Sequence, residues 1–139
     1  MTVERTYAMI KPDAVKRKLI GKIVDRIEAE GFTIVAMRKH CFSLKEAQGF
    51  YFVHRARPFY PELTEFMSSG PIVALVLERD NAIAHWRDTM GATNPANAAP
   101  NTLRKLHAAS IGENCVHGSD APDTAAQEMG FMFPGISLL

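Results

Sequence analysis

A histidine near the C-terminal end of the chain is flanked by residue types that could help it bind an anion and react with it. It lies in residues 114–120, which read NCVHGSD. His117 follows a short apolar run, and the glycine after it lets the backbone turn sharply. Ser119 or Asp120 is expected to cap a helix that continues through Glu128. Because backbone N–H groups at a helix N-terminus favour anions, the pattern points to His117 as a reactive centre, although an isolated histidine in such a place is more often structural.

Cationic residues elsewhere in the chain could serve this centre if its ligand carries phosphate. The two commonest nucleotide-binding loops, G-x-x-x-x-G-K-[ST] and G-x-G-x-x-G, are absent, so side chains would have to hold the phosphates. The candidates are Lys11 at a predicted strand end, Arg87 in a predicted helix and Arg104 beside a long loop. Thr93 could add a hydroxyl donor from that loop. Each of these residues, taken alone, is more often explained as surface charge or turn chemistry.

Three other side chains have both a functional and a structural interpretation. Phe59 follows a proline in a polar break, where it could stack a nucleobase or plug the core. Tyr51 could present its hydroxyl to the site or simply pack. Glu128 could orient the imidazole of His117, or it could face solvent. The remaining histidines form no metal-binding pattern and are interpreted as structural or surface residues.

Length and composition bound the class of protein. The 139 residues fit a single domain, 1–139, and 47% hydrophobic with 22% charged residues is ordinary for a globular protein. A net charge of +1 predicts no general attraction to nucleic acid or to acidic membranes. Cys41 and Cys115 lack the spacing of a disulfide framework or metal motif, and no apolar run is long enough for a membrane span. A cytoplasmic location is expected.

The elements that must position these residues follow from the apolar periodicity. Strands are predicted over 5–11, 33–37, 72–77 and 115–116, and the run 72–77 is expected to be buried on both faces. A first helix is predicted to start at Pro12 and to be stopped by Gly31, and a second starts at the capping box of Ser43 and Glu46. Further helices are predicted over 62–67, after an Asp80 cap, and over 103–106 and 121–128. Residues 91–101 read as a loop. This order predicts an α+β, ferredoxin-like βαββαβ fold with an antiparallel sheet and helices on one face.

The chain resembles the nucleoside diphosphate kinase family over nearly its whole length. The pattern Asn114-x-x-His117-Gly118-Ser119-Asp120 looks like the active-site signature of that family. Four further segments agree with it in chain order: 10–15 (IKPDAV), 49–51 (GFY), 57–59 (RPF) and 90–95 (MGATNP). Chance agreement of all five segments is negligible.

The resemblance implies an enzyme that moves the γ-phosphate of a nucleoside triphosphate to a nucleoside diphosphate. The mechanism would be ping-pong, through a phosphohistidine on His117, with broad base specificity. Mg²⁺ would be held by the nucleotide phosphates and not directly by the protein. By this resemblance, each matching residue would have one of five roles. These are phosphate binding (Lys11, Arg87, Thr93, Arg104), base stacking (Phe59), contact with the sugar hydroxyls (Lys11, Asn114), support of the phosphate pocket (Tyr51) and holding of the imidazole (Ser119, Glu128).

The resemblance also implies a homo-oligomer, either a tetramer or a hexamer. An unpaired edge strand invites pairing, so we expect the strand 33–37 to be covered, the loop 91–101 to lie near a subunit contact, and the apolar tail 136–139 to bury itself there. The chain departs from the family pattern at Leu106-His107, where many members have Asp and an aromatic residue, and in its ending, 131–139.

Two rival interpretations stay open at this level. Ser119 could be the nucleophile of a hydrolase with His117 as its base, although the Gly-x-Ser-x-Gly context is missing. The chain could also be a non-catalytic ferredoxin-like module that binds a nucleotide.

Overall fold

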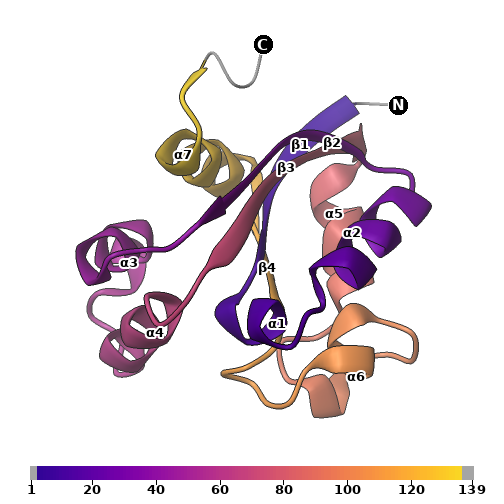
Figure 1. Ribbon diagram of the computed structural model, residues 1–139. Coiled ribbons are helices and arrows are strands. Elements are labelled where there is room, and N and C mark those ends of the chain that lie inside the picture. Colours follow the sequence, from indigo (N-terminus) through magenta and orange to yellow (C-terminus); the bar gives the residue numbers. More distant parts are fainter. Residues whose placement is uncertain (1–2, 136–139) are drawn as a thin grey trace.

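A four-stranded antiparallel sheet forms the centre of the computed structural model, which describes residues 3–135. Its strands are β1 (Val3–Ile10), β2 (Thr33–His40), β3 (Ile72–Asp80) and β4 (Val116–Gly118). Their order across the sheet is β2-β3-β1-β4, so β1 and β3 are the central pair (Figure 1). The α+β, split βαββαβ arrangement predicted from the sequence is confirmed.

Helices cover both faces of this sheet (Figure 1). One face packs against α1 (Pro12–Lys16), α2 (Ile20–Ala29), α5 (Ala82–Met90) and α6 (Leu103–His107). The other packs against α3 (Leu44–Phe50), α4 (Tyr60–Met67) and α7 (Pro122–Met132). The expectation of helices on one face was therefore wrong. The reason is that β1 and β3 present buried apolar residues alternately to both sides, Ala8 and Ile10 to one and Tyr7 and Met9 to the other.

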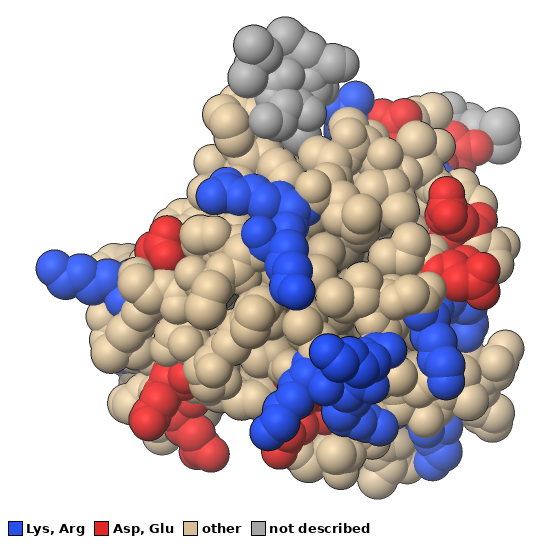
Figure 2. All heavy atoms as spheres, in the orientation of Figure 1, with Lys and Arg blue, Asp and Glu red and all other residues tan. Residues whose placement is uncertain are grey.

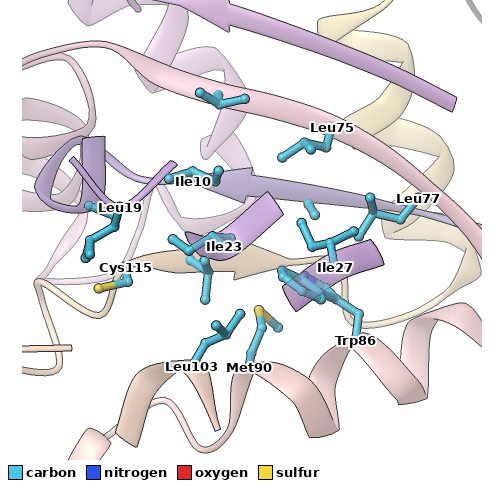
Figure 3. Packing of buried hydrophobic residues seen from close by; sticks show 14 of the residues in the cluster. Ile10, Leu19, Ile23, Ile27, Leu75, Leu77, Trp86, Met90, Leu103 and Cys115 are labelled. Carbon is cyan, nitrogen blue, oxygen red and sulfur yellow. The ribbon is translucent and has the colours of Figure 1, made fainter. Parts of the chain in front are cut away.

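The first of these two cores anchors the segment that precedes His117. Ile23 and Ile27 of α2 meet Trp86 and other residues of α5 beneath β1 and β3 (Figure 3). Full burial of each such side chain contributes about 1.5–3 kcal/mol relative to exposure. Cys115 belongs to the same cluster and is fully buried. The short strand β4 is thus fixed to the core by the residue at its entrance.

Several local predictions need correction. The single helix expected between Pro12 and Gly31 is divided into α1 and α2 by a turn in which Lys18 has a φ of 62°. Asp80 does not cap α5, because the Glu4 carboxylate of β1 accepts the Ile83 N–H at 2.9 Å instead. Ser43 and Glu46 do form the predicted capping box at the start of α3. Two short 3₁₀ segments, Phe52–His54 and Pro95–Asn97, complete the regular elements.

Charged side chains of both signs are distributed over the surface in view in Figure 2. The largest group of Lys and Arg there lies over α1 and the turn after it, where Lys16, Arg17 and Lys18 are exposed. The other residues of α1 are buried, among them Asp13. This short helix therefore has a solvated end and a buried end beside β4. No helix within residues 3–135 has the length and apolar character needed to cross a membrane.

Candidate active site

The predicted functional residues converge on one open pocket of about 450 Å³ at the end of the sheet. Among the residues that line it are Lys11, Tyr51, Phe59, Arg87, Thr93, Arg104, Asn114 and His117. A second hollow shares Lys11, Phe59 and Asn114 with the first and continues it between Phe66 and Ile111. The structure thus brings together eight of the ten side chains proposed from the sequence, and the other two, Ser119 and Glu128, lie directly behind the histidine.

His117 is held in the middle of β4 with one ring nitrogen occupied. Its Nε2 lies 2.9 Å from Oε1 of Glu128, which also accepts the Ser119 hydroxyl at 2.7 Å. An ionised carboxylate can only accept, so Nε2 carries the proton of that bond and Nδ1 keeps its lone pair. The rings of Phe50 and Tyr51 stand at 5.8 and 6.1 Å from the imidazole. The ring is therefore oriented by hydrogen bonding on one side and by aromatic packing around it.

Of the two roles predicted for Ser119, helix cap and support of the imidazole through Glu128, the contacts fit the second. Ser119 does not cap α7, and neither does Asp120. The hydroxyl of Thr124, inside the helix, accepts the N–H groups of Asp120 at 3.2 Å and Ala121 at 3.0 Å. This leaves the Ser119 hydroxyl available to Glu128. Ser119 therefore lies where the family resemblance implied, beside the carboxylate that contacts the imidazole.

Gly118 allows the close approach of β4 to α5. A Cβ at this position would lie 2.5 Å from Cδ1 of Trp86 and 2.7 Å from Cε of Met90. The same indole donates its Nε1–H to the carbonyl of His117 at 3.2 Å. Trp86 is almost completely buried, so it cannot give way to a larger residue. Gly118 ends β4 and is not among the described glycines of positive φ, so packing, and not the sharp turn expected from the sequence, is what requires a glycine here.

Arg104 is built into the wall of the pocket. It is 8% exposed, and its Nη atoms donate to the carbonyls of Gly91 at 2.9 Å and Val116 at 2.8 Å. Its Nε has no hydrogen-bond partner among residues 3–135. Burial, with a smaller effect of Arg87, lowers the pKa of Arg104 to about 10, so the guanidinium is charged at neutral pH. Because Arg104 lines the pocket, its positive charge can stabilise an anion there.

Lys11 and Arg87 are paired with polar groups of the pocket itself. The Lys11 ammonium donates to Oδ1 of Asn114 at 2.8 Å, and burial lowers the pKa of Lys11 to about 8. Asn114 in turn donates to the carbonyl of Thr93 at 3.2 Å, which ties the long loop to the site. Arg87 is exposed and lies 2.6 Å from a carboxylate oxygen of Asp120. The exposed pair can open to admit a ligand at small energetic cost.

His54 and Ile111 line the pocket and the adjoining hollow but were not singled out from the sequence. His54 lines the pocket, with its ring centroid 6.5 Å from that of Tyr51 and 5.6 Å from that of Phe59. The three-residue spacing of Tyr51 and His54, which suits one face of a helical turn, was the available signal. Ile111 faces the apolar hollow together with Phe59, but a lone isoleucine in a loop gives no signal of that kind.

Comparison with known proteins assigns this architecture to a family. The family model described as nucleoside diphosphate kinase matches residues 4–137. Proteins named nucleoside diphosphate kinase from Pelobacter propionicus and Rhizobium meliloti are each 58% identical, the first over 99% of this chain and 100% of its own length, the second over 100% and 99%. The solved nucleoside diphosphate kinase of Aquifex aeolicus superposes with a TM-score of 0.97 at 45% identity, over 99% of this chain and 100% of that chain. That of Halobacterium salinarum, in complex with CDP, gives 0.94 at 37%, over 99% and 92%. The resemblance seen in the sequence is confirmed, and the chain belongs to the nucleoside diphosphate kinase family.

Proposed function

We propose that this chain transfers the γ-phosphate of a nucleoside triphosphate to a nucleoside diphosphate through a phosphohistidine on His117. The observation that carries the proposal is the pairing of Nε2 with Glu128, which leaves Nδ1 as the unprotonated nitrogen of a histidine that lines a pocket rich in cations. A neutral imidazole is a competent nucleophile near pH 7, and a phosphoramidate can pass the group on.

The two half-reactions use the same groups in opposite order. The Nδ1 lone pair forms a bond to the γ-phosphorus while the bond from that phosphorus to the bridging oxygen breaks, and the diphosphate leaves with the electron pair. Glu128 keeps its hydrogen bond to Nε2–H and stabilises the positive charge that develops on the ring. A second diphosphate then attacks the phosphohistidine through a terminal oxygen, which returns the electron pair to Nδ1. Parallel-line, ping-pong kinetics follow from this sequence.

The remaining pocket residues position the nucleotide. Lys11, Arg87 and Arg104 stabilise the charge on the phosphates, with the Thr93 hydroxyl as a further donor and Tyr51 supporting the pocket wall. Asn114 and Lys11 face the sugar hydroxyls. Phe59 stacks the base at the apolar hollow, and stacking tolerates every base, so we expect broad base specificity.

Mg²⁺ fits such a site as an ion held by the nucleotide phosphates. The exposed carboxylates of Asp88 and Asp120 line the pocket and can contact such an ion through its bound water. When bound, the ion neutralises charge on the phosphates.

We also propose that residues 1–139 act as one nucleoside diphosphate kinase-like domain within a homo-oligomer, either a tetramer or a hexamer, without membrane or specific nucleic-acid partners. Two cysteines without a disulfide, one exposed and one buried, are compatible with a reducing cytoplasm.

The test is labelling by γ-³²P-ATP and Mg²⁺ in the absence of acceptor. We expect an acid-labile, base-stable phosphate on the wild-type protein, none on His117→Ala, and transfer of the label to added nucleoside diphosphate. Label on a serine would support the hydrolase alternative, which the burial of Ser119 and its bond to Glu128 disfavour. Nucleotide binding without turnover would support the non-catalytic module.

A further inference from the structure

The backbone two residues before His117 adopts a conformation that L-residues rarely take. Cys115 has a φ of 72°, and the N–H of Val116 donates to the carbonyl of Asn114 at 2.9 Å across it. A bond from residue i+2 to residue i around a central residue of positive φ defines a γ-turn of the rare, strained kind. Such a turn persists only where its surroundings hold it in place. It joins Asn114, which binds Lys11, to the strand that carries His117.

A buried carboxylate from α1 holds this turn. Oδ2 of Asp13 accepts the N–H of Cys115 at 3.0 Å, and the carbonyl of Cys115 accepts the N–H of Lys11 at 2.8 Å. Both backbone groups of the strained residue are thus satisfied from the segment 11–13. Asp13 is 6% exposed, and its other oxygen, Oδ1, is buried without a hydrogen-bond partner among the described residues. Burying a carboxylate with one oxygen that makes no hydrogen bond is costly, which points to a role for Asp13 beyond stability.

We propose that Asp13 is a positioning residue for phosphotransfer, which holds the Cys115 turn in front of His117, and that its negative charge acts on the nearby side chain of Lys11, two residues before it in the chain. The proposal rests on the function proposed above. Asp13 lies on α1, and Lys11 directly precedes this helix. The start of α1 therefore contacts the turn before His117 and also carries the lysine proposed to bind the nucleotide.

The charges around Lys11 support the second half of this role. Burial lowers the pKa of Lys11, and Arg104 lowers it further, whereas Asp13 raises it, with smaller contributions in the same direction from Cys115 and Glu113. Asp13 is the largest of the effects that oppose burial. Burial also raises the pKa of the Cys115 thiol to about 11, so at neutral pH the thiol carries no charge that could replace the carboxylate.

The experiment separates the two contributions of Asp13. Asp13→Asn keeps an oxygen that can accept the Cys115 N–H but removes the charge. We expect its kcat/KM to fall at a lower pH than in the wild type, with the alkaline limb displaced by on the order of 1 pH unit, and with near wild-type activity at pH 6.5. Asp13→Ala removes the acceptor as well. We expect its single-turnover rate of His117 phosphorylation to fall about tenfold or more at pH 6.5, with a smaller change in KM.

A rescue variant tests the turn itself. Glycine adopts positive φ without steric cost, so Cys115→Gly in the Asp13→Ala background should recover part of the lost phosphorylation rate. If Asp13→Asn does not fold alone, the same pH profile is recorded for Asp13→Asn with Cys115→Gly. Asp25→Asn, which changes an exposed aspartate on α2, is the matched control and should behave as wild type.

Two results would overturn the assignment. One is an alkaline limb that does not move on loss of the Asp13 charge, and the other is a wild-type phosphorylation rate in folded Asp13→Ala. Labelling of the wild-type protein is measured in the same series, so failure of the proposed function appears as an unlabelled wild type and is not confused with failure of the Asp13 role.

Discussion

At the scale of single residues, the site works by assigning one task to each polar atom around His117. Glu128 occupies Nε2, Ser119 holds Glu128 from the other side, and the carbonyl of His117 is taken by Trp86. Nδ1 is therefore the ring nitrogen that can attack phosphorus. This division of tasks depends on Glu128 being a pure acceptor, a property that an amide in its place does not share.

Glu128→Gln should therefore slow phosphorylation more than it destabilises the fold. The amide can donate as well as accept, so it no longer imposes one tautomer, and it carries no charge to stabilise the imidazolium-like transition state. We expect the single-turnover rate with ATP to fall on the order of 10²-fold. Glu28→Gln, an exposed position on α2, is the control. An unchanged rate combined with a lowered Tm would show that Glu128 is only structural.

Lys11 predicts an alkaline limit of activity. Its pKa lies at about 8, below the ordinary 10.5, because burial disfavours the charged ammonium. Below pH 8 the ammonium is charged and can bind phosphate, and above pH 8 that charge is lost, so kcat/KM should decline as pH rises through this value. The same burial disfavours the folded state while Lys11 is charged, so Lys11→Met should lose activity at pH 7 without a lower Tm. A pH profile flat to pH 9.5 would contradict this interpretation of Lys11.

At the scale of elements, the strand that carries the nucleophile is only three residues long and depends on its neighbours for its position. β4 pairs with β1 and packs against α5 at Gly118. It is preceded by a strained turn that Asp13 of α1 holds in place. Each contact comes from a segment far away in the sequence. The short element is thus placed by tertiary structure and not by its own propensity.

This dependence explains which features could be predicted from the sequence. The buried run 72–77, the capping box at Ser43 and the convergence of the cations on His117 follow from local pattern or from the family motifs, and the structure agrees with them. The Glu4 cap of α5 and the Thr124 contacts replaced predicted caps, because several nearby polar groups could satisfy the same N–H. The Cys115 turn could not be predicted from the sequence, because the Asp13 carboxylate that accepts its N–H is 102 residues away.

Gly118→Ala tests the packing of β4 against α5. The new Cβ would meet the Trp86 and Met90 side chains well inside contact distance, and the buried indole has no room to move. We expect the free energy of unfolding to fall by about 1–3 kcal/mol, together with slower phosphorylation, because β4 must shift. Gly21→Ala in α2 is the control, since a Cβ there meets nothing within 4 Å and should stabilise the helix by about 0.5–1 kcal/mol. Urea titration of both variants measures the difference, and equal stability would contradict the packing argument.

At the scale of the whole molecule, the sheet leaves β2 as an edge. β2 pairs with β3 on one side, and the structure places no strand of residues 3–135 on the other. Met37 on this strand is 55% exposed, although it is a large apolar residue. The helices cover the two faces of the sheet, so the edge of β2, and not an uncovered face, is the surface that favours association. The apolar tail 136–139, to which a similar role was assigned, lies outside the described residues.

We therefore expect the protein to be a homo-oligomer in which the edge of β2 lies within a subunit contact. Unpaired strand edges with exposed apolar residues favour pairing with another chain, and a closed symmetric assembly protects them by repeating one contact. Multi-angle light scattering at micromolar concentration should give a mass several times 15.4 kDa. Met37→Glu places a charge on the edge strand and should shift the distribution toward smaller species, with the nucleotide pocket left chemically unchanged. A stable and fully active species near 15.4 kDa would show that this edge needs no partner.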